Sequence, residues 1–191
     1  MSSIETPRLI LRRWKADDRE PFARLNADPR VMRFFPSTLS RVESDGLAGR
    51  IELALKARGW GLYAAEGRES GEFLGFIGLS VPDFAAHFTP CVEIGWRLAA
   101  EFWNRGLATE GARAVVSYAF ETLKIPELVS FTTEGNLPSR RVMEKIGMTH
   151  DPADDFDHPR LAEGHPLRHH VLYRLSQTDS GASGKTSAGP A

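Results

Sequence analysis

Residues 91–133 constrain the fold of this chain more than any other stretch. Residues 91–98 (CVEIGWRL) alternate between apolar and polar side chains, which is the pattern of a β-strand with one buried face. Residues 107–123 carry a single apolar stripe at helical spacing. Residues 127–133 (ELVSFTT) are again typical of a strand. A strand, a helix and a second strand in this order form a crossover unit, which predicts an α/β or α+β fold.

The other periodic segments place a largely antiparallel half before this unit and further elements after it. We therefore expect a single domain over residues 1–175, with a mixed, mostly antiparallel sheet flanked by helices. Residues 176–191 are rich in Gly, Ser and Ala, so we expect a disordered tail there. Further strands are expected at residues 8–14, 60–66, 73–81 and 167–175, and further helices at 17–26, 40–58 and 136–147.

Composition and charge exclude several classes of function. The 191 residues include 24 basic and 25 acidic residues, a formal net charge of −1, whereas a dedicated DNA- or RNA-binding domain usually has a basic excess. No apolar run approaches the roughly 20 residues that span a bilayer. The single cysteine, Cys91, permits no internal disulfide, which favours a reducing compartment. We therefore expect a cytoplasmic protein with no nucleic-acid or membrane partner.

The stretch FWNRGLATEG, residues 102–111, places an arginine and a glycine directly before the central helix. The amides of residues 105–109 have no partners within the helix, and the helix dipole puts partial positive charge there. A pyrophosphate is a natural ligand for such a helix start, and Gly106 removes the side chain that would block it. The alternative is a tight turn with a solvent-exposed arginine, and the motif alone does not decide between the two.

The sequence VEIGWRLAAEFWNRGLATEGARAVVSYAF, followed by NLPSRRVMEKIGM, resembles the GNAT superfamily of acyl-CoA-dependent N-acetyltransferases. The resemblance covers most of residues 6–175 and is closest to the branch of the ribosomal-protein N-terminal acetyltransferases. Gly106 and Ala108 fill the last two fixed positions of the superfamily's phosphate motif, while Trp103 stands where that motif has Gln or Arg. The resemblance implies a GNAT fold whose sheet is splayed at an acetyl-CoA cleft.

The resemblance also implies which residues hold acetyl-CoA. The amides of residues 105–109 would bind the pyrophosphate, and the pantetheine would lie beside residues 93–98 like an added strand. Asn136 matches the position that lies near the pantetheine arm. The implied cofactor-binding residues are Trp96, Leu98, Arg105, Gly106, Leu107, Ala108, Thr109 and Asn136.

Acetyl transfer to an amine requires a neutral nitrogen nucleophile and a proton for the leaving thiolate. Glu93 lies on the polar face of its predicted strand, near the expected thioester, and is our candidate for the general base. A solvated strand glutamate is the alternative. The helix at 136–147 has no tyrosine, so the resemblance points to Ser139 as the group that protonates the thiolate. A helix-capping serine is the alternative there.

Acceptor specificity is expected from loops over the strand ends. Phe34, Phe35 and Phe84 lie in two aromatic-rich loops, where they either bind the acceptor or pack in the core. No metal site is expected, because His169 and His170 are adjacent in a predicted strand and therefore point to opposite faces.

The expected function is an acetyl-CoA-dependent N-acetyltransferase that moves an acetyl group to a primary amine by direct attack in a ternary complex. The acceptor would be a protein N-terminal α-amine or a small amine. The alternative is a GNAT-like protein that binds acyl-CoA without turnover, as a sensor or interaction module. A monomer and a homodimer both fit the sequence.

Overall fold

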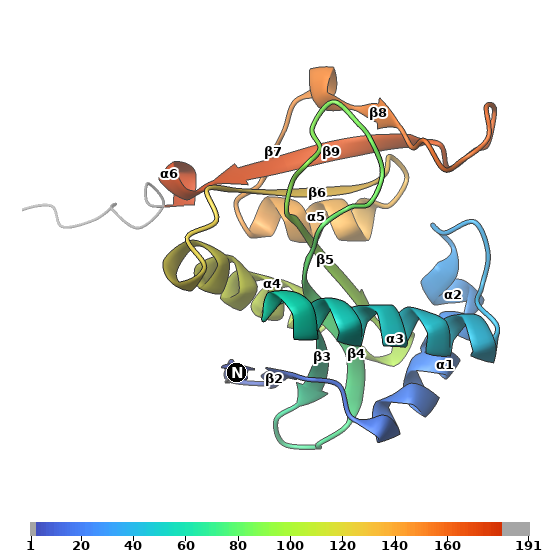
Figure 1. The fold of residues 1–191 in the computed structure, drawn as a ribbon, viewed down its shortest axis with the longest axis vertical. Coiled ribbons are helices and arrows are strands. Elements are labelled where there is room, and N and C mark those ends of the chain that lie inside the picture. The colour runs from blue at the N-terminus through green and yellow to red at the C-terminus, as the bar shows by residue number, and fades with distance from the viewer. Residues whose placement is uncertain (1–2, 181–191) are drawn as a thin grey trace, which may run out of the picture.

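One nine-stranded sheet organises the computed structural model, which describes residues 3–180 (Figure 1). Its strands follow the order β1-β2-β3-β4-β5-β6-β9-β7, and β8 pairs with β9. Neighbouring strands are antiparallel except for β5 and β6, which are parallel. The strands are β1 (Ile4–Glu5), β2 (Leu9–Arg12), β3 (Leu62–Gly67), β4 (Phe73–Ser80), β5 (Glu93–Leu98), β6 (Glu127–Thr133), β7 (Thr149–His150), β8 (Phe156–Asp157) and β9 (His169–Ser176).

Helices cover both faces of this sheet. Phe22 of α1 contacts Phe76 of β4, whereas Gly111 of α4 lies against Ile77, and adjacent residues of a strand point to opposite faces. α3 packs on α1. Within residues 3–180, none of the helices is long and apolar enough to cross a bilayer. The helical segments are η1 (Ala16–Asp18), α1 (Arg19–Ala27), α2 (Pro29–Met32), α3 (Arg41–Arg58), η2 (Ala100–Phe102), α4 (Leu107–Ser117), η3 (Tyr118–Thr122, a π-helical turn), α5 (Leu137–Lys145), η4 (Pro152–Asp154) and α6 (Gln177–Ser180).

The boundaries of α3 show how local sequence sets an element. The Ser40 side chain accepts a hydrogen bond from the Glu43 amide, and the Glu43 carboxylate accepts one from the Ser40 amide, which is a capping box. Gly59 ends the helix with a left-handed φ of 81°, a conformation that glycine adopts without steric penalty. The predicted helix at residues 40–58 is therefore confirmed.

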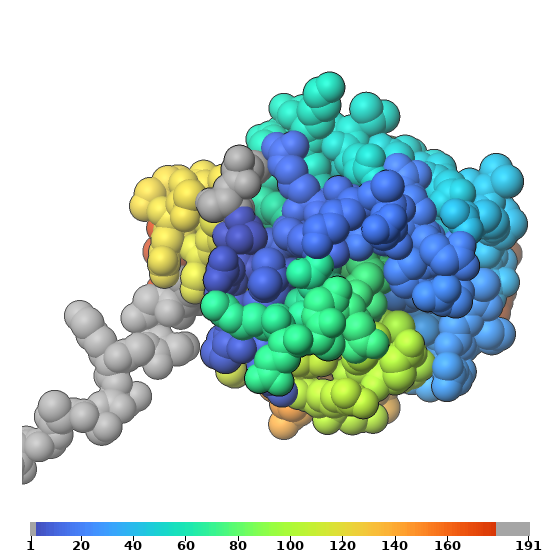
Figure 2. Space-filling model, turned by 90° about the horizontal axis from the view of Figure 1, so that it is seen from below, coloured from blue at the N-terminus to red at the C-terminus, as the bar shows by residue number. Residues whose placement is uncertain are grey.

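The turn between β3 and β4 is hydrogen-bonded to the N-terminal strands. Gly67 donates to the Glu72 carbonyl within the turn, and Arg68 donates to the Arg8 carbonyl beside β2. In Figure 2 this turn (green) lies between the N-terminal strands (dark blue) and the η2 segment (yellow-green). The predicted strands at 60–66 and 73–81 therefore form a hairpin, and its turn is hydrogen-bonded to the N-terminal part of the chain.

β5 and β6 pair at one position only. Glu93 is the single register partner of Val129, and the Val129 amide donates to the Val92 carbonyl at 2.9 Å. Beyond that pair the two strands diverge, although β5 continues to Leu98 and β6 to Thr133. The predicted sheet, mostly antiparallel and splayed between these two strands, is therefore confirmed.

The alternation along β5 is also as predicted. Ile94 and Leu98 are 0% and 5% exposed and belong to the main core. On the opposite face, Glu93 is the cross-strand partner of Ser80, and Arg97 is that of Phe76. The polar residues of β5 therefore share the sheet face that α1 covers.

The predicted tail at 176–191 needs correction at its start. β9 extends to Ser176, which pairs with Glu127 of β6, and the Gln177 amide donates to the Pro126 carbonyl at 3.0 Å. The structure places Gln177–Ser180 in α6. Pairing with β6 thus extends regular structure beyond residue 175, into the predicted tail. The rest of that tail, residues 181–191, lies outside the described residues.

We predict that Gly78→Ala destabilises the sheet by about 1–3 kcal/mol, as overpacking does. A Cβ atom at Gly78 would lie 2.2 Å from the Gly61 carbonyl oxygen and 2.8 Å from the Leu62 Cα atom, both of which are backbone. Gly49→Ala on α3 is the control, because nothing lies within 4 Å of its Cβ position and alanine favours a helix by up to about 1 kcal/mol. Urea unfolding of both variants measures the free energies. Equal stabilities would contradict the close approach of β3 and β4.

Candidate functional site

The start of α4 has the geometry that its sequence predicts. Gly106 is the residue before the helix and has a left-handed φ of 76°, and Asn104 is also left-handed, with a φ of 59°. The first amide to find a backbone acceptor is that of Glu110, which donates to the Gly106 carbonyl. Within the described chain, the amides of residues 107–109 have no hydrogen-bond acceptor, so they remain available to an anion.

Arg8 and Glu110 hold this turn in place. The Arg8 guanidinium donates to the Glu110 carboxylate, with Nε 2.6 Å from Oε2, and its Nη1 donates to the Arg105 carbonyl at 2.9 Å. Glu110 also accepts from the Thr6 hydroxyl at 2.7 Å. The sequence analysis missed this network. Glu110 stands in the FWNRGLATEG stretch, and a carboxylate in the first turn of a helix was a signal worth pursuing.

A groove runs beside Gly106 toward the end of α5. Its walls come from the N-terminal strands, from α4 and from Lys145. Arg8, Arg113 and Lys145 give it three basic side chains against the two carboxylates Glu5 and Glu110. The free amides of α4 and this basic groove are therefore neighbours, which suits a ligand with several phosphates. The groove is lined by Glu5, Thr6, Pro7, Arg8, Gly106, Thr109, Glu110, Arg113, Ala114 and Lys145.

The edge of β5 that faces β6 has no strand partner at Trp96 and Leu98. Because the Val92 carbonyl points toward β6, the alternation of a strand also directs the backbone groups of Trp96 and Leu98 to that side. The indole of Trp103 donates to the Leu98 carbonyl at 2.8 Å. Trp103, the one departure from the phosphate motif, thus anchors the segment after β5 to the strand.

Glu93 lies where the two strands begin to separate. Its Oε2 accepts a hydrogen bond from the Ser80 hydroxyl at 2.9 Å. Burial raises the pKa of the Glu93 carboxyl to about 7, although the Ser80 hydrogen bond acts in the opposite direction. A Cβ atom built on Gly95 would meet only Glu93 Oε1, at 4.0 Å, so bare backbone lies beside the carboxyl group.

The start of α5 is capped by Asn136 rather than by Ser139. The Asn136 side-chain oxygen accepts from the Ser139 amide, and its Nδ2 donates to the Thr132 hydroxyl at 2.8 Å. The Ser139 hydroxyl has no partner within residues 3–180 and is half-buried. The capping alternative for Ser139 is therefore wrong, because its own amide is the group that is capped.

The predicted acceptor aromatics fall into two groups. The Phe35 ring lies 4.1 Å from the Arg97 guanidinium carbon, and Phe34 lies 3.9 Å from the Cβ position of Gly135. The loop after α2 therefore bridges the far ends of β5 and β6. Phe84 lies in a second core cluster, against Phe131, Phe156 and His158.

Two histidines, His158 and His170, line this second cluster. His158 and His170 have ring centroids 5.1 Å apart, and burial lowers the pKa of both imidazoles. Across the described part of the chain, no group of three His, Cys, Asp or Glu side chains is arranged to hold a metal ion. Burial also raises the pKa of the Cys91 thiol to about 11, so this thiol stays protonated and is a poor nucleophile.

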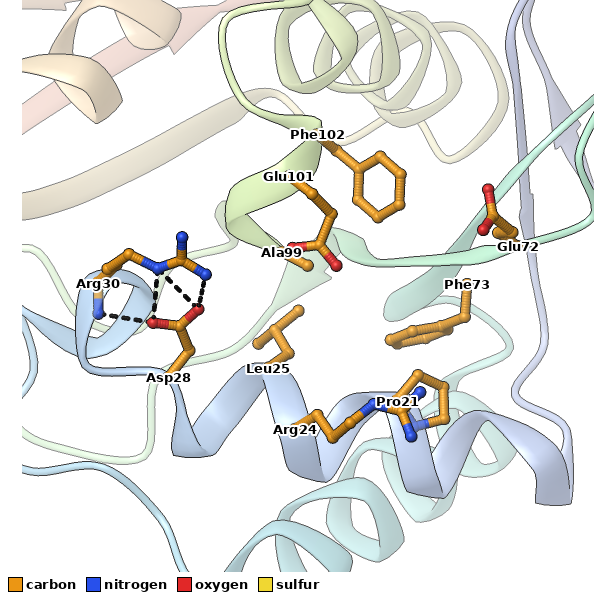
Figure 3. A pocket seen from close by; sticks show the side chains of 10 residues that line it. All are labelled: Pro21, Arg24, Leu25, Asp28, Arg30, Glu72, Phe73, Ala99, Glu101 and Phe102. Atoms are coloured by element: carbon orange, nitrogen blue, oxygen red, sulfur yellow. Dashed lines mark hydrogen bonds and ion pairs between the residues drawn. The ribbon is translucent and has the colours of Figure 1, made fainter.

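A separate hollow lies between α1 and η2 (Figure 3). Figure 3 shows Asp28 and Arg30 paired at one end, and Glu101 and Phe102 reaching down from η2. The Arg30 Nη2 lies 2.6 Å from Asp28 Oδ2. None of the predicted site residues lines this hollow, so the candidate site stays with the β5–β6 cleft and the start of α4.

Comparison with known proteins agrees with this geometry. Residues 8–149 match the Acetyltransferase (GNAT) domain family. FsC-acetyl coenzyme A-N(2)-transacetylase from Aspergillus fumigatus is 34% identical over 155 residues, which cover 78% of this chain and 65% of that relative's length.

Two solved structures share the fold. An acetyltransferase from Agrobacterium tumefaciens is 30% identical, with a TM-score of 0.74, and the match covers 92% of this chain and 94% of that one. A ribosomal L7/L12 alpha-N-protein acetyltransferase in complex with coenzyme A has a TM-score of 0.72 at 16% identity, covering 92% and 98% of the two chains. The second likeness supports the fold alone.

We predict that Glu93 makes the stability of the fold fall as pH rises. The folded protein holds a proton on Glu93 up to a pH of about 7, whereas the unfolded chain releases it near 4.3. The contribution of Glu93 to the free energy of unfolding is fully present below about pH 4. It is lost between about pH 4 and pH 7, by at most about 1.4 kcal/mol per pH unit. Urea unfolding between pH 4 and 8 should show Glu93→Gln gaining stability over the wild type as pH rises. The exposed Glu72→Gln is the control, and a parallel gain in both variants would contradict the assignment.

Proposed function

Because this chain belongs to the GNAT acetyltransferase family, we propose that it transfers the acetyl group of acetyl-CoA to a primary amine in a ternary complex. The acceptor is a small amine or a protein N-terminal α-amine. The observation that carries this proposal is the divergence of β5 from β6, with the free amides of α4 beyond the end of β5 and Glu93 at the one register pair.

The residues of this chain fit acetyl-CoA by charge and by backbone geometry. The amides of residues 107–109, together with Arg105, bind the pyrophosphate, since a helix start carries partial positive charge. The pantetheine lies along the open edge of β5 at Trp96 and Leu98, where it takes the place that β6 has left. Asn136 lies at the opposite wall of the cleft, at the start of α5.

Glu93 acts as the general base, directly or through one water molecule. Deprotonating an α-amine at pH 7 costs about 1 kcal/mol, whereas deprotonating a lysine amine costs about 4–5 kcal/mol. A carboxylate with a pKa of about 7 is therefore a suitable base for an α-amine. The amine nitrogen attacks the thioester carbon, the carbon–sulfur bond breaks, and the thiolate takes a proton from the Ser139 hydroxyl, which is reprotonated by water as Glu93 later releases its own proton to solvent. The proton that the amine loses goes to Glu93.

The proposed function is tested by binding and turnover together. Calorimetry with acetyl-CoA measures binding, and thiol release over a panel of amines measures transfer. Tight binding with amine-dependent thiol release supports the proposal. Binding with no transfer to any amine would instead indicate a sensor, and no binding would remove the assignment altogether.

We predict that Gly106→Ala weakens acetyl-CoA binding at least tenfold, because an added side chain hinders the approach of the pyrophosphate to the amides. Gly164→Ala is the matched control. Gly106 and Gly164 have φ values of 76° and 78°, so both variants carry a similar backbone penalty of about 1–2 kcal/mol. Calorimetry and thermal unfolding should show similar stability losses and a loss of affinity only at Gly106. Equal affinities in the two variants would move the phosphate site elsewhere.

We also predict that Glu93→Gln lowers kcat/KM by about 100-fold, as loss of a general base does. In the wild type, kcat/KM corrected for free amine should rise with pH through a midpoint near 7, and the variant should lack this rise. Ser80→Ala removes the hydrogen bond that favours the carboxylate, so its midpoint should lie at higher pH. An unchanged pH profile in both variants would exclude Glu93 as the base.

A further inference from the structure

Arg97 is a half-buried cation with no acidic partner among residues 3–180. Its guanidinium group is enclosed under Phe35 and Phe76, whose ring centroids lie 4.1 and 5.4 Å from the guanidinium carbon. No carboxylate within residues 3–180 forms an ion pair with it, and its Nε atom is buried without a hydrogen-bond acceptor. A charge buried in this way costs free energy unless an anion pairs with it.

The single hydrogen bond of this guanidinium leaves one particular edge free. Nη1 donates to the Asn26 side-chain oxygen at 2.6 Å. Asn26 is itself fully buried, and its Nδ2 donates to the Ser44 hydroxyl at 2.9 Å, so its oxygen is fixed toward Arg97. The free edge therefore consists of Nε and Nη2, which together form a fork that matches the two oxygens of a carboxylate.

This fork lies on the same side of the sheet as the proposed base. Glu93, Gly95 and Arg97 alternate onto one face of β5, and a Cβ position at Gly95 is open to everything except the Glu93 carboxyl. Across the cleft, Thr133 of β6 has a buried hydroxyl that also lacks a partner. Val129 pairs with Glu93, so the two side chains lie on the same face of the sheet. Thr133 is four residues further along β6 and therefore lies on that face as well.

Phe35 lies over the Arg97 guanidinium group. Its side chain stacks on Arg97 but is 39% exposed, which is unusual for a large aromatic. The adjacent Phe34 reaches the loop after β6, at Gly135. Phe34 and Phe35 therefore lie between Arg97 and the loop after β6.

We propose that Arg97 binds a carboxylate of the amine acceptor, so that the acceptor class is amino acids and related amines that carry an acid group. The carboxylate pairs with Nε and Nη2 as Phe35 moves aside, while the amine lies toward Glu93. This inference rests on the proposed function and adds to it the chemistry of the acceptor. Glu93 at one end of this face complements the amine of an acceptor, and Arg97 at the other end complements its carboxylate.

A purely structural role for Arg97 is the competing explanation. In that case the guanidinium only supports the loop that carries Phe35, and acceptors with and without a carboxylate are used alike. An uncharged side chain would support the loop without the cost of burying a charge, which is why the observations favour a ligand.

The test compares matched acceptors on the wild-type protein. Glycine with methylamine, β-alanine with ethylamine and 4-aminobutanoate with propylamine differ only by the carboxylate. With rates corrected for the concentration of free amine, we expect at least one amino acid to have a kcat/KM about 10- to 100-fold higher than its matched amine. This ratio corresponds to the free energy of a hydrogen bond to a charged group. Ratios near one in all pairs, with amines still consumed, would overturn the inference. Acetyl-CoA binding without transfer to any amine would overturn the proposed function instead.

Variants then separate binding from support of the fold. Arg97→Gln should bring the ratio of acid to plain amine close to one, and Arg97→Lys, which keeps the charge but not the fork, should give an intermediate ratio. Exposed Arg24→Gln is the control and should keep the wild-type ratio. A structural role lowers both rates together and leaves the ratio unchanged, which would contradict the inference. If Arg97→Gln does not fold, the wild-type ratios still decide.

Discussion

The separation of β5 from β6 is the constraint on which the rest of the structure depends. The two strands share one register pair, at Glu93 and Val129, and then leave backbone groups along β5 without sheet partners. Unpaired backbone groups are costly when buried, so a fold that keeps such an edge needs water or a ligand to complete it. α4 starts directly beyond this edge with its own free amides. The start of α4 thus adds free hydrogen-bond donors to those of the unpaired edge of β5.

Burial gives this surface its chemical character. Desolvation raises the pKa of the Glu93 carboxyl to about 7 and lowers that of the Arg97 guanidinium to about 10, so each group is shifted toward its neutral form. The two side chains have opposite charges on one face of one strand, yet they form no ion pair with each other. Gly95 lies between Glu93 and Arg97 on this face, so the carboxyl and guanidinium groups stay apart, and a ligand could contact both. An ion pair between them would have closed the site.

Local patterns predict much of this arrangement and none of its long-range contacts. The alternation of β5 places Glu93 on the polar face, and a glycine before an amphipathic stripe predicts the start of α4. Arg8 reaches Arg105 across 97 positions, and Arg97 reaches Asn26 across 71. Such pairs follow from topology, and periodicity carries no information about them. The cap of α5 is a local feature. Asn136 provides it, because the residue before a helix accepts hydrogen bonds from the amides of the first turn, whereas Ser139 lies inside the helix.

The contact between Arg8 and the Arg105 carbonyl has a thermodynamic consequence for the opening strands. A ligand bound at the start of α4 would restrain the turn at Arg105, and the hydrogen bond from Arg8 to the Arg105 carbonyl would pass part of that restraint to β2. By linkage, a bound ligand raises the free energy needed to detach this edge of the sheet. Amide hydrogen exchange along β2 therefore becomes a reporter of events at a turn almost a hundred residues away in the chain.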